Sequence, residues 1–139
     1  MEPPYVQLWS SVPNGTCVCS QQMLMFTCIT TGFLVVWRSN EYFNNNLEEI
    51  TFTRDSAIQR ERTFGSVKAV LTDVTTIGSS VTLNSTLIIV VTEHHQRFSV
   101  SCHGDNSKIV KRRSYYLNGE HLHASMILLA VDRSLAKGE

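Results

Sequence analysis

Residues 23–28 read MLMFTC, an apolar run that ends in a cysteine. Two similar runs follow: residues 33–37, FLVVW, end in a tryptophan, and residues 98–102, FSVSC, end in a second cysteine. Short apolar runs rich in β-branched and aromatic residues predict strands. Cysteines that point inward from facing strands can join two sheets by a disulfide, and a buried tryptophan can pack on such a bridge. The pattern therefore predicts an all-β sandwich.

The sequence after Trp37 predicts further strands, a turn and a loop. Residues 67–71 and 81–91 alternate or are rich in β-branched residues, which predicts two strands joined through a turn at residues 77–80, IGSS. On the second strand, alternation places Leu83, Leu87 and Ile89 on one face. Residues 55–62 carry mixed charge and predict a solvated loop.

These features resemble the immunoglobulin superfamily over residues 5–118. Trp37 follows Cys28 by nine residues, and the long interval to Cys102 is similar to that of variable-type or intermediate-type domains. Residues 83–89, LNSTLII, are similar to the family's strand E. The region as a whole is most similar to the immunoglobulin-like domains of invertebrate receptor-like proteins.

The resemblance implies an immunoglobulin-like two-sheet antiparallel β-sandwich, with an inter-sheet disulfide between Cys28 and Cys102 and with Trp37 in the core. We expect residues 1–119 to form this domain and residues 120–139 to be an extension that packs on the sandwich or is disordered. The sequence departs from the family at Val100, where a tyrosine often ties down the corner between strands E and F. Another contact must hold that corner.

Composition limits the class of protein. The 139 residues suit one domain, and 17% charged with 42% hydrophobic residues is typical of a globular chain. A formal net charge of zero argues against nucleic-acid binding. The apolar run at residues 126–131 is far shorter than the roughly 20 residues of a membrane span, so we predict no membrane span in this chain.

The predicted disulfide belongs to an oxidising compartment, so we expect an extracellular protein, either secreted or part of a cell-surface ectodomain. Residues 1–5, MEPPY, are no signal peptide, so we expect an excised fragment or a missing natural start. Asn14 and Asn84 begin the sequons Asn-Gly-Thr and Asn-Ser-Thr, which predict glycosylation of a secreted chain.

Cys17 and Cys19 remain after the predicted pairing. A bridge between residues two apart is strained. We expect that one or both are free, are bonded to another chain or to a cysteine outside this sequence, or are small buried residues at the start of the sandwich.

No pattern in the sequence predicts catalysis, a cofactor or a metal site. The five histidines, at positions 94, 95, 103, 121 and 123, show neither a His-Glu-x-x-His pattern nor a partner Cys-x-x-Cys, and we expect exposed loop residues. The rival hypothesis, a metal-dependent protein, requires at least three of them to converge. A Gly-x-Ser-x-Gly elbow and a phosphate-binding glycine loop are also missing from the sequence.

The resemblance implies a partner-binding surface on the outer face of the sheet that holds strands C, F and G. There we predict partner contacts by Leu34, Val36, Arg38, Tyr42 and Tyr115. Two alternatives stay open: the segment at 126–131 folds back over this face, or the apolar residues Met23, Met25, Ile88 and Val90 form an interface on the opposite sheet.

The basic run at residues 108–113 either meets an acidic partner or a sulfated glycan, or is a site for a processing protease, or protects a sheet edge.

The sequence therefore predicts a non-enzymatic recognition or adhesion module that binds a protein, with a like domain as one candidate partner. The alternative is a secreted effector or a carbohydrate-binding module on the same fold, which requires a groove with aromatic and polar residues near the loops.

Overall fold

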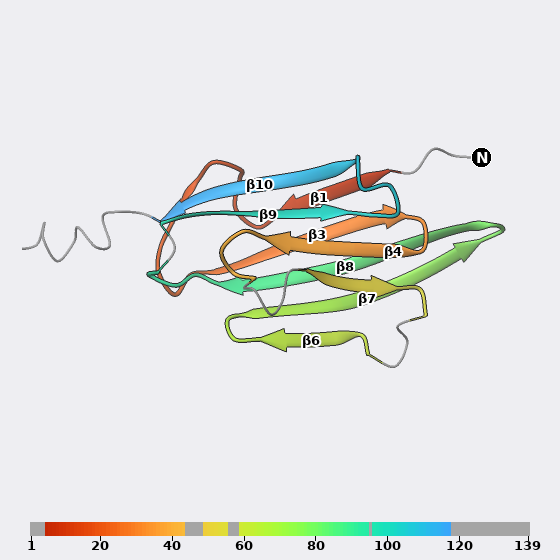
Figure 1. Ribbon diagram of the computed structural model, residues 1–139, viewed down its shortest axis with the longest axis horizontal. Coiled ribbons are helices and arrows are strands. Elements are labelled where there is room, and N and C mark those ends of the chain that lie inside the picture. Colours follow the sequence, from red (N-terminus) through yellow and green to blue (C-terminus); the bar gives the residue numbers. More distant parts are fainter. Residues whose placement is uncertain (1–4, 44–48, 56–58, 95, 118–139) are drawn as a thin grey trace, which may run out of the picture.

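Two five-stranded sheets lie face to face in the computed structural model (Figure 1). The structure describes residues 5–43, 49–55, 59–94 and 96–117. Its strands are β1 (Val6–Ser10), β2 (Cys17–Val18), β3 (Met23–Thr31), β4 (Leu34–Ser39), β5 (Ile50–Thr53), β6 (Glu61–Phe64), β7 (Val67–Ile77), β8 (Ser80–Val90), β9 (Arg97–His103) and β10 (Val110–Leu117). The predicted boundary between a domain at 1–119 and an extension at 120–139 lies outside the described residues.

Sheet I has the strand order β1-β3-β8-β7-β6, and sheet II has the order β2-β10-β9-β4-β5. Every pairing is antiparallel apart from the short parallel pairing of β2 with β10. This arrangement confirms the predicted all-β two-sheet sandwich, and it is compatible with an immunoglobulin-like fold.

Period-two alternation explains the long strands of sheet I. In β3 and β8 the buried and exposed side chains alternate, because successive side chains point to opposite faces of a sheet. The inward residues of β8 include Leu83, Leu87 and Ile89, each fully buried, which confirms the face predicted from the sequence. The predicted turn at 77–80 joins β7 to β8, with Gly78 in the left-handed region at φ 63°.

A disulfide joins the two sheets at the centre of the core. Cys28 of β3 is bonded to Cys102 of β9, with 6.5 Å between their Cα atoms. Trp37 of β4 is completely buried, and its indole N–H donates a 2.8 Å hydrogen bond to the hydroxyl of Ser85. That hydroxyl donates in turn to the carbonyl of Val70 at 2.7 Å. The polar atom of the indole is therefore satisfied inside the core.

Tyr42 supplies the contact at the corner where Val100 departs from the family pattern. Its hydroxyl accepts a 3.0 Å hydrogen bond from the backbone N–H of Thr92, in the connection between β8 and β9. Its ring packs edge-on against Phe98, with 4.9 Å between ring centroids. A tyrosine that follows β4 thus holds the corner between β8 and β9.

We expect Tyr42→Phe to lower the free energy of unfolding by about 1 kcal/mol, because the N–H of Thr92 loses its acceptor while the ring contact with Phe98 stays. Urea unfolding followed by tryptophan fluorescence measures this difference. The matched variant is Tyr116→Phe, whose side chain is 42% exposed and whose substitution should change stability by less than about 0.5 kcal/mol. Equal effects of the two substitutions would contradict the assigned role of the Tyr42 hydroxyl.

The expectation of a loop throughout 55–62 is wrong at its end. Strand β6 begins at Glu61 and pairs with β7, with Glu61 opposite Val70 and Phe64 opposite Val67. This short strand lies at the edge of sheet I and none of its four residues is buried, so it lacks the alternation by which a half-buried strand is recognised in a sequence.

Candidate recognition surface

The outer face of sheet II brings two arginines to either side of a serine. Strand β9 lies between β4 and β10, and its inward residues Val100 and Cys102 leave Ser99, Ser101 and His103 facing outward. In the register, Ser101 is opposite Arg38 of β4 on one side. On the other side Ser101 is opposite Arg112 of β10.

These residues surround a small hollow of about 240 Å³, which we call the arginine hollow. It is lined by Arg38, Ser39, Asn40, Ser99, Ser101 and Arg112. Ser101 is only 7% exposed, and its hydroxyl has no hydrogen-bond partner among the described residues. The side-chain oxygen of Asn40 accepts a 2.8 Å hydrogen bond from the backbone N–H of Ser99. This bond holds the side-chain amide of Asn40 at the rim of the hollow.

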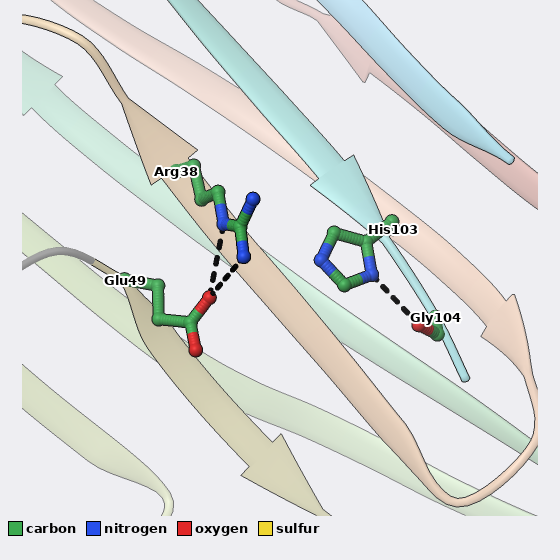
Figure 2. A network of polar contacts seen from close by, with 4 residues as sticks. All are labelled: Arg38, Glu49, His103 and Gly104. Carbon is green, nitrogen blue, oxygen red and sulfur yellow. Dashed lines mark hydrogen bonds and ion pairs between the residues drawn. The ribbon is translucent and has the colours of Figure 1, made fainter. Parts of the chain in front are cut away.

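The two arginines of the hollow differ in their electrostatic environment. The guanidinium of Arg38 contacts one carboxylate oxygen of Glu49 through Nε and Nη2, both at 2.9 Å (Figure 2). Arg112 is exposed and forms no ion pair or hydrogen bond with any described side chain. The charge of Arg38 is therefore matched within the domain, whereas the charge of Arg112 is not.

His103 ends β9 on the same face, one row beyond the hollow. Its Nδ1 lies 2.7 Å from the carbonyl oxygen of Gly104, so we assign the proton to Nδ1 as the donor (Figure 2). Its Nε2 is buried and has no partner among the described residues. The expectation that His103 is an exposed loop residue is wrong, because Val36 and Val110 flank it in the neighbouring strands and only 7% of it is exposed.

The histidines do not form a metal site in the described part of the chain, where no group of three His, Cys, Asp or Glu side chains is placed to hold an ion. His94 is exposed in the connection before β9, far along the strand from His103. His95, His121 and His123 lie outside the described residues.

The structure places the five predicted partner contacts in different environments. Arg38 is exposed and Leu34 is half-buried, both on the outer face of β4. Val36 lies on that face too, but Thr51 and His103 flank it and leave 4% exposed, so it is wrong as an exposed anchor. Tyr42 is half-buried and its hydroxyl is used by the fold.

Tyr115 is wrong as a partner contact because its ring lies in the core. Register places it opposite the inward residue Phe98, and the two ring centroids are 5.6 Å apart. Its hydroxyl contacts the hydroxyl of Ser10 and donates a 2.8 Å hydrogen bond to the carbonyl of Val12. Burial raises the pKa of Tyr115 above its ordinary value.

The basic run is divided between two sides of β10. Arg112 faces outward over sheet II, whereas Lys111 and Arg113 line a separate groove beside β1. Arg113 donates a 2.9 Å hydrogen bond to the carbonyl of Leu8, which links the open edge of sheet I to sheet II. The run is therefore not one continuous basic patch.

Several large apolar side chains are exposed on the outer face of sheet I. Met23 is 60% exposed and Met25 is 44% exposed, with Val90 and Ile88 directly opposite them on β8. Trp9, 48% exposed, extends this patch along β1. The sequence prediction named the methionines and missed Trp9, although the alternation of residues 5–9 contained the signal.

Both predicted glycosylation sites are accessible. Asn14 is exposed in the turn between β1 and β2, and Asn84 is half-exposed on the outer face of β8. In each case the side-chain oxygen accepts a hydrogen bond, from the N–H of Ser114 and from the hydroxyl of Thr72 respectively. The amide nitrogen to which a glycan is attached is not the atom used in either bond. Attachment at Asn14 and Asn84 stays a prediction.

Cys17 and Cys19 are both free and exposed, so the expectation of buried residues at the start of the sandwich is wrong for them. We expect the double substitution Cys17→Ser and Cys19→Ser to change the free energy of unfolding by less than about 0.5 kcal/mol, because no packed contact is lost. Chemical denaturation under non-reducing conditions tests this, with a thiol assay to confirm two reactive groups before substitution. A loss above 2 kcal/mol would show that these thiols stabilise the fold.

The sequence matches no protein-family model, and no curated protein matches it. In the described part of the chain no helix is long and apolar enough to cross a membrane.

Proposed function

We propose that this chain is an immunoglobulin-like recognition or adhesion module of a secreted or cell-surface protein, related to invertebrate receptor-like proteins. Its activity is binding rather than catalysis, and its partner is a protein. The contact surface is the outer face of sheet II with the adjoining loops. A second copy of the domain is one candidate partner.

The fold supports this proposal at the level of architecture. A disulfide between facing sheets, with a buried tryptophan on one of them, is the arrangement that the resemblance implies. Such bridges persist in oxidising compartments, which favours a secreted or surface protein. A rigid sandwich of this kind presents its outer faces and loops with little change of shape on binding.

The arginine hollow is the observation that carries the proposal. Ser101 is only 7% exposed, but its hydroxyl opens into the hollow, where it has no hydrogen-bond partner among the described residues and is available to a ligand. Arg112 stands beside it with an unmatched charge. The hydroxyl of Ser101 and the guanidinium of Arg112 are therefore both available to form bonds with a partner seated on this face.

A screen against an array of extracellular proteins that includes the domain itself tests the proposal. The wild-type domain, displayed as a tetramer, is compared with the double variant Arg38→Gln, Arg112→Gln. We expect a partner whose binding weakens at least about tenfold in the double variant, because arginines in desolvated interface positions often dominate affinity.

The matched control is Lys68→Gln on the outer face of sheet I, where the ammonium group pairs with Glu61 at 3.1 Å. This variant should keep wild-type binding. A partner that binds the wild type and the double variant equally, or that is lost only with Lys68→Gln, contradicts the assignment of the interface to sheet II.

A further inference from the structure

We propose that the arginine hollow is a subsite for one carboxylate group, supplied by an aspartate or glutamate side chain of the protein partner. This inference rests on the proposed function, since it names the chemistry of the partner at the same face. The hollow is nevertheless testable on its own, with a small acidic probe and no partner.

The geometry of the sheet sets the width of the subsite. Neighbouring strands lie about 4.8 Å apart, so β4 and β10, on either side of β9, are separated by about 10 Å. Arg38 and Arg112 rise from these two strands in register, and Ser101 lies between them on β9. An acidic side chain that enters from solvent meets Arg112, unpaired among the described residues, on one side and Ser101 beneath it. On the other side it meets Arg38, whose guanidinium is already bonded to Glu49.

The donors of the hollow suit an anion that accepts several hydrogen bonds. The Ser101 hydroxyl has no partner among the described residues, and the Arg112 guanidinium has all its donors available. The side-chain oxygen of Asn40 already accepts a hydrogen bond from the N–H of Ser99, so the N–H₂ group of the same amide is the part that can donate to a ligand. A carboxylate accepts from all three kinds of group and forms charge-assisted bonds with arginine.

The charges inside the hollow favour one added negative charge. Glu49 already neutralises Arg38 through two contacts of 2.9 Å to one of its oxygens. A carboxylate on Arg112 would create a second pair and leave the hollow neutral. When a partner removes water from this face, each arginine would then have a carboxylate: Glu49 for Arg38, and the partner's acidic group for Arg112. Neither charge would be desolvated without an opposite charge beside it.

The size and lining of the hollow favour a protein side chain over an acidic sugar. Its volume of about 240 Å³ is below the roughly 300–1,000 Å³ of typical small-ligand pockets. None of the described residues that line it is aromatic, so a sugar ring has no surface on which to stack. Tyr116 is exposed on the same face, but the guanidinium of Arg97 lies over its ring, 5.3 Å from the centroid.

The test is an NMR titration of the ¹⁵N-labelled chain of 139 residues. The probe is N-acetyl-glutamic acid α-amide, whose only charge is its side-chain carboxylate, and the matched neutral probe is N-acetyl-glutamine α-amide. We expect saturable shifts at the backbone amides of Ser99, Ser101 and Arg112 with the acidic probe alone, with a dissociation constant on the order of 1 mM. Raising the salt concentration should weaken this binding, because the Arg112 charge is exposed.

Three variants separate the roles of the residues. Arg112→Gln should weaken probe binding at least about tenfold, and Ser101→Ala about threefold to tenfold, because a hydrogen bond to a charged group is lost in each. Arg97→Gln removes an arginine of the same face that does not line the hollow, and it should change affinity less than about twofold. The dispersed spectrum of each variant confirms that it is folded.

Several outcomes overturn the inference. The carboxylate subsite is wrong if the acidic probe gives no saturable shift, if the glutamine probe gives the same shifts, or if Arg112→Gln binds like the wild type. Tighter binding of glucuronic acid than of the glutamate probe would instead assign the hollow to an acidic glycan. If the array partner is lost in the Arg38, Arg112 variant while no probe binds, the subsite fails and the proposed interface on sheet II stands.

Discussion

Replacement of both Cys28 and Cys102 by alanine is expected to lower the free energy of unfolding by about 4.5 kcal/mol. The bridge closes a loop with a sequence separation of 74 residues, and the chain-entropy model assigns about this value to a loop of that length. Measured losses for native disulfides of small secreted domains run from about 2 to 5 kcal/mol. Since domains are stable by only about 5–15 kcal/mol, this single change removes a large part of the total.

Guanidinium denaturation of the wild type and of the double alanine variant, both without reductant, measures the difference. The control is the Cys17→Ser, Cys19→Ser variant, which replaces the same number of cysteines at exposed positions outside the bridge. The variant without the bridge should also lose about 10–20 °C of thermal stability. A loss of similar size in the two variants would mean that the bridge is not the source of the stability.

Trp37→Ala is expected to cost about 3–5 kcal/mol, the usual range for removal of a large aromatic side chain from a packed core. The residue is completely buried, and its indole is hydrogen-bonded to Ser85. Trp37→Phe separates the two contributions. It keeps most of the packed volume and removes the 2.8 Å bond, so about 1 kcal/mol is expected for the bond, with a smaller part for the changed shape.

The second tryptophan provides an internal comparison. Trp9 is 48% exposed on the edge strand β1, and Trp9→Ala should cost well under half of the loss seen for Trp37→Ala. Urea unfolding monitored by circular dichroism measures both variants without reliance on tryptophan emission. If Trp9→Ala is the more damaging substitution, the core has been assigned to the wrong part of the sandwich.

The proposed function and the proposed carboxylate subsite require different properties of the partner. The interface on sheet II needs only a partner that covers this face, whereas the subsite needs an acidic group directed at Arg112. The exposed apolar patch of Trp9, Met23 and Met25 lies on sheet I, so it is separate from both and is not altered by the variants proposed for the hollow.

Much of the fold is determined by local sequence pattern. Alternation in β3 and β8 predicted which side chains face inward, since a strand has a period of two whatever its neighbours are. The Ile-Gly-Ser-Ser turn was predicted from the residues alone, whereas the pairing of Cys28 with Cys102 was predicted from the resemblance to a known fold. Strand β6 was missed, because an edge strand with no buried residue leaves no apolar period in the sequence.

The candidate site depended on tertiary structure. Arg38, Ser101 and Arg112 are far apart in the chain, and alternation gives each a face but no neighbours. Only the registers of β4 and β10 against β9 place them in one row. The prediction that Tyr115 contacts a partner is wrong for the same reason, since its pairing with Phe98 decides that its ring enters the core. The alternation of residues along a strand determines which side chains share a face of the sheet. The register between neighbouring strands, which only the tertiary structure sets, determines which of those side chains lie next to one another.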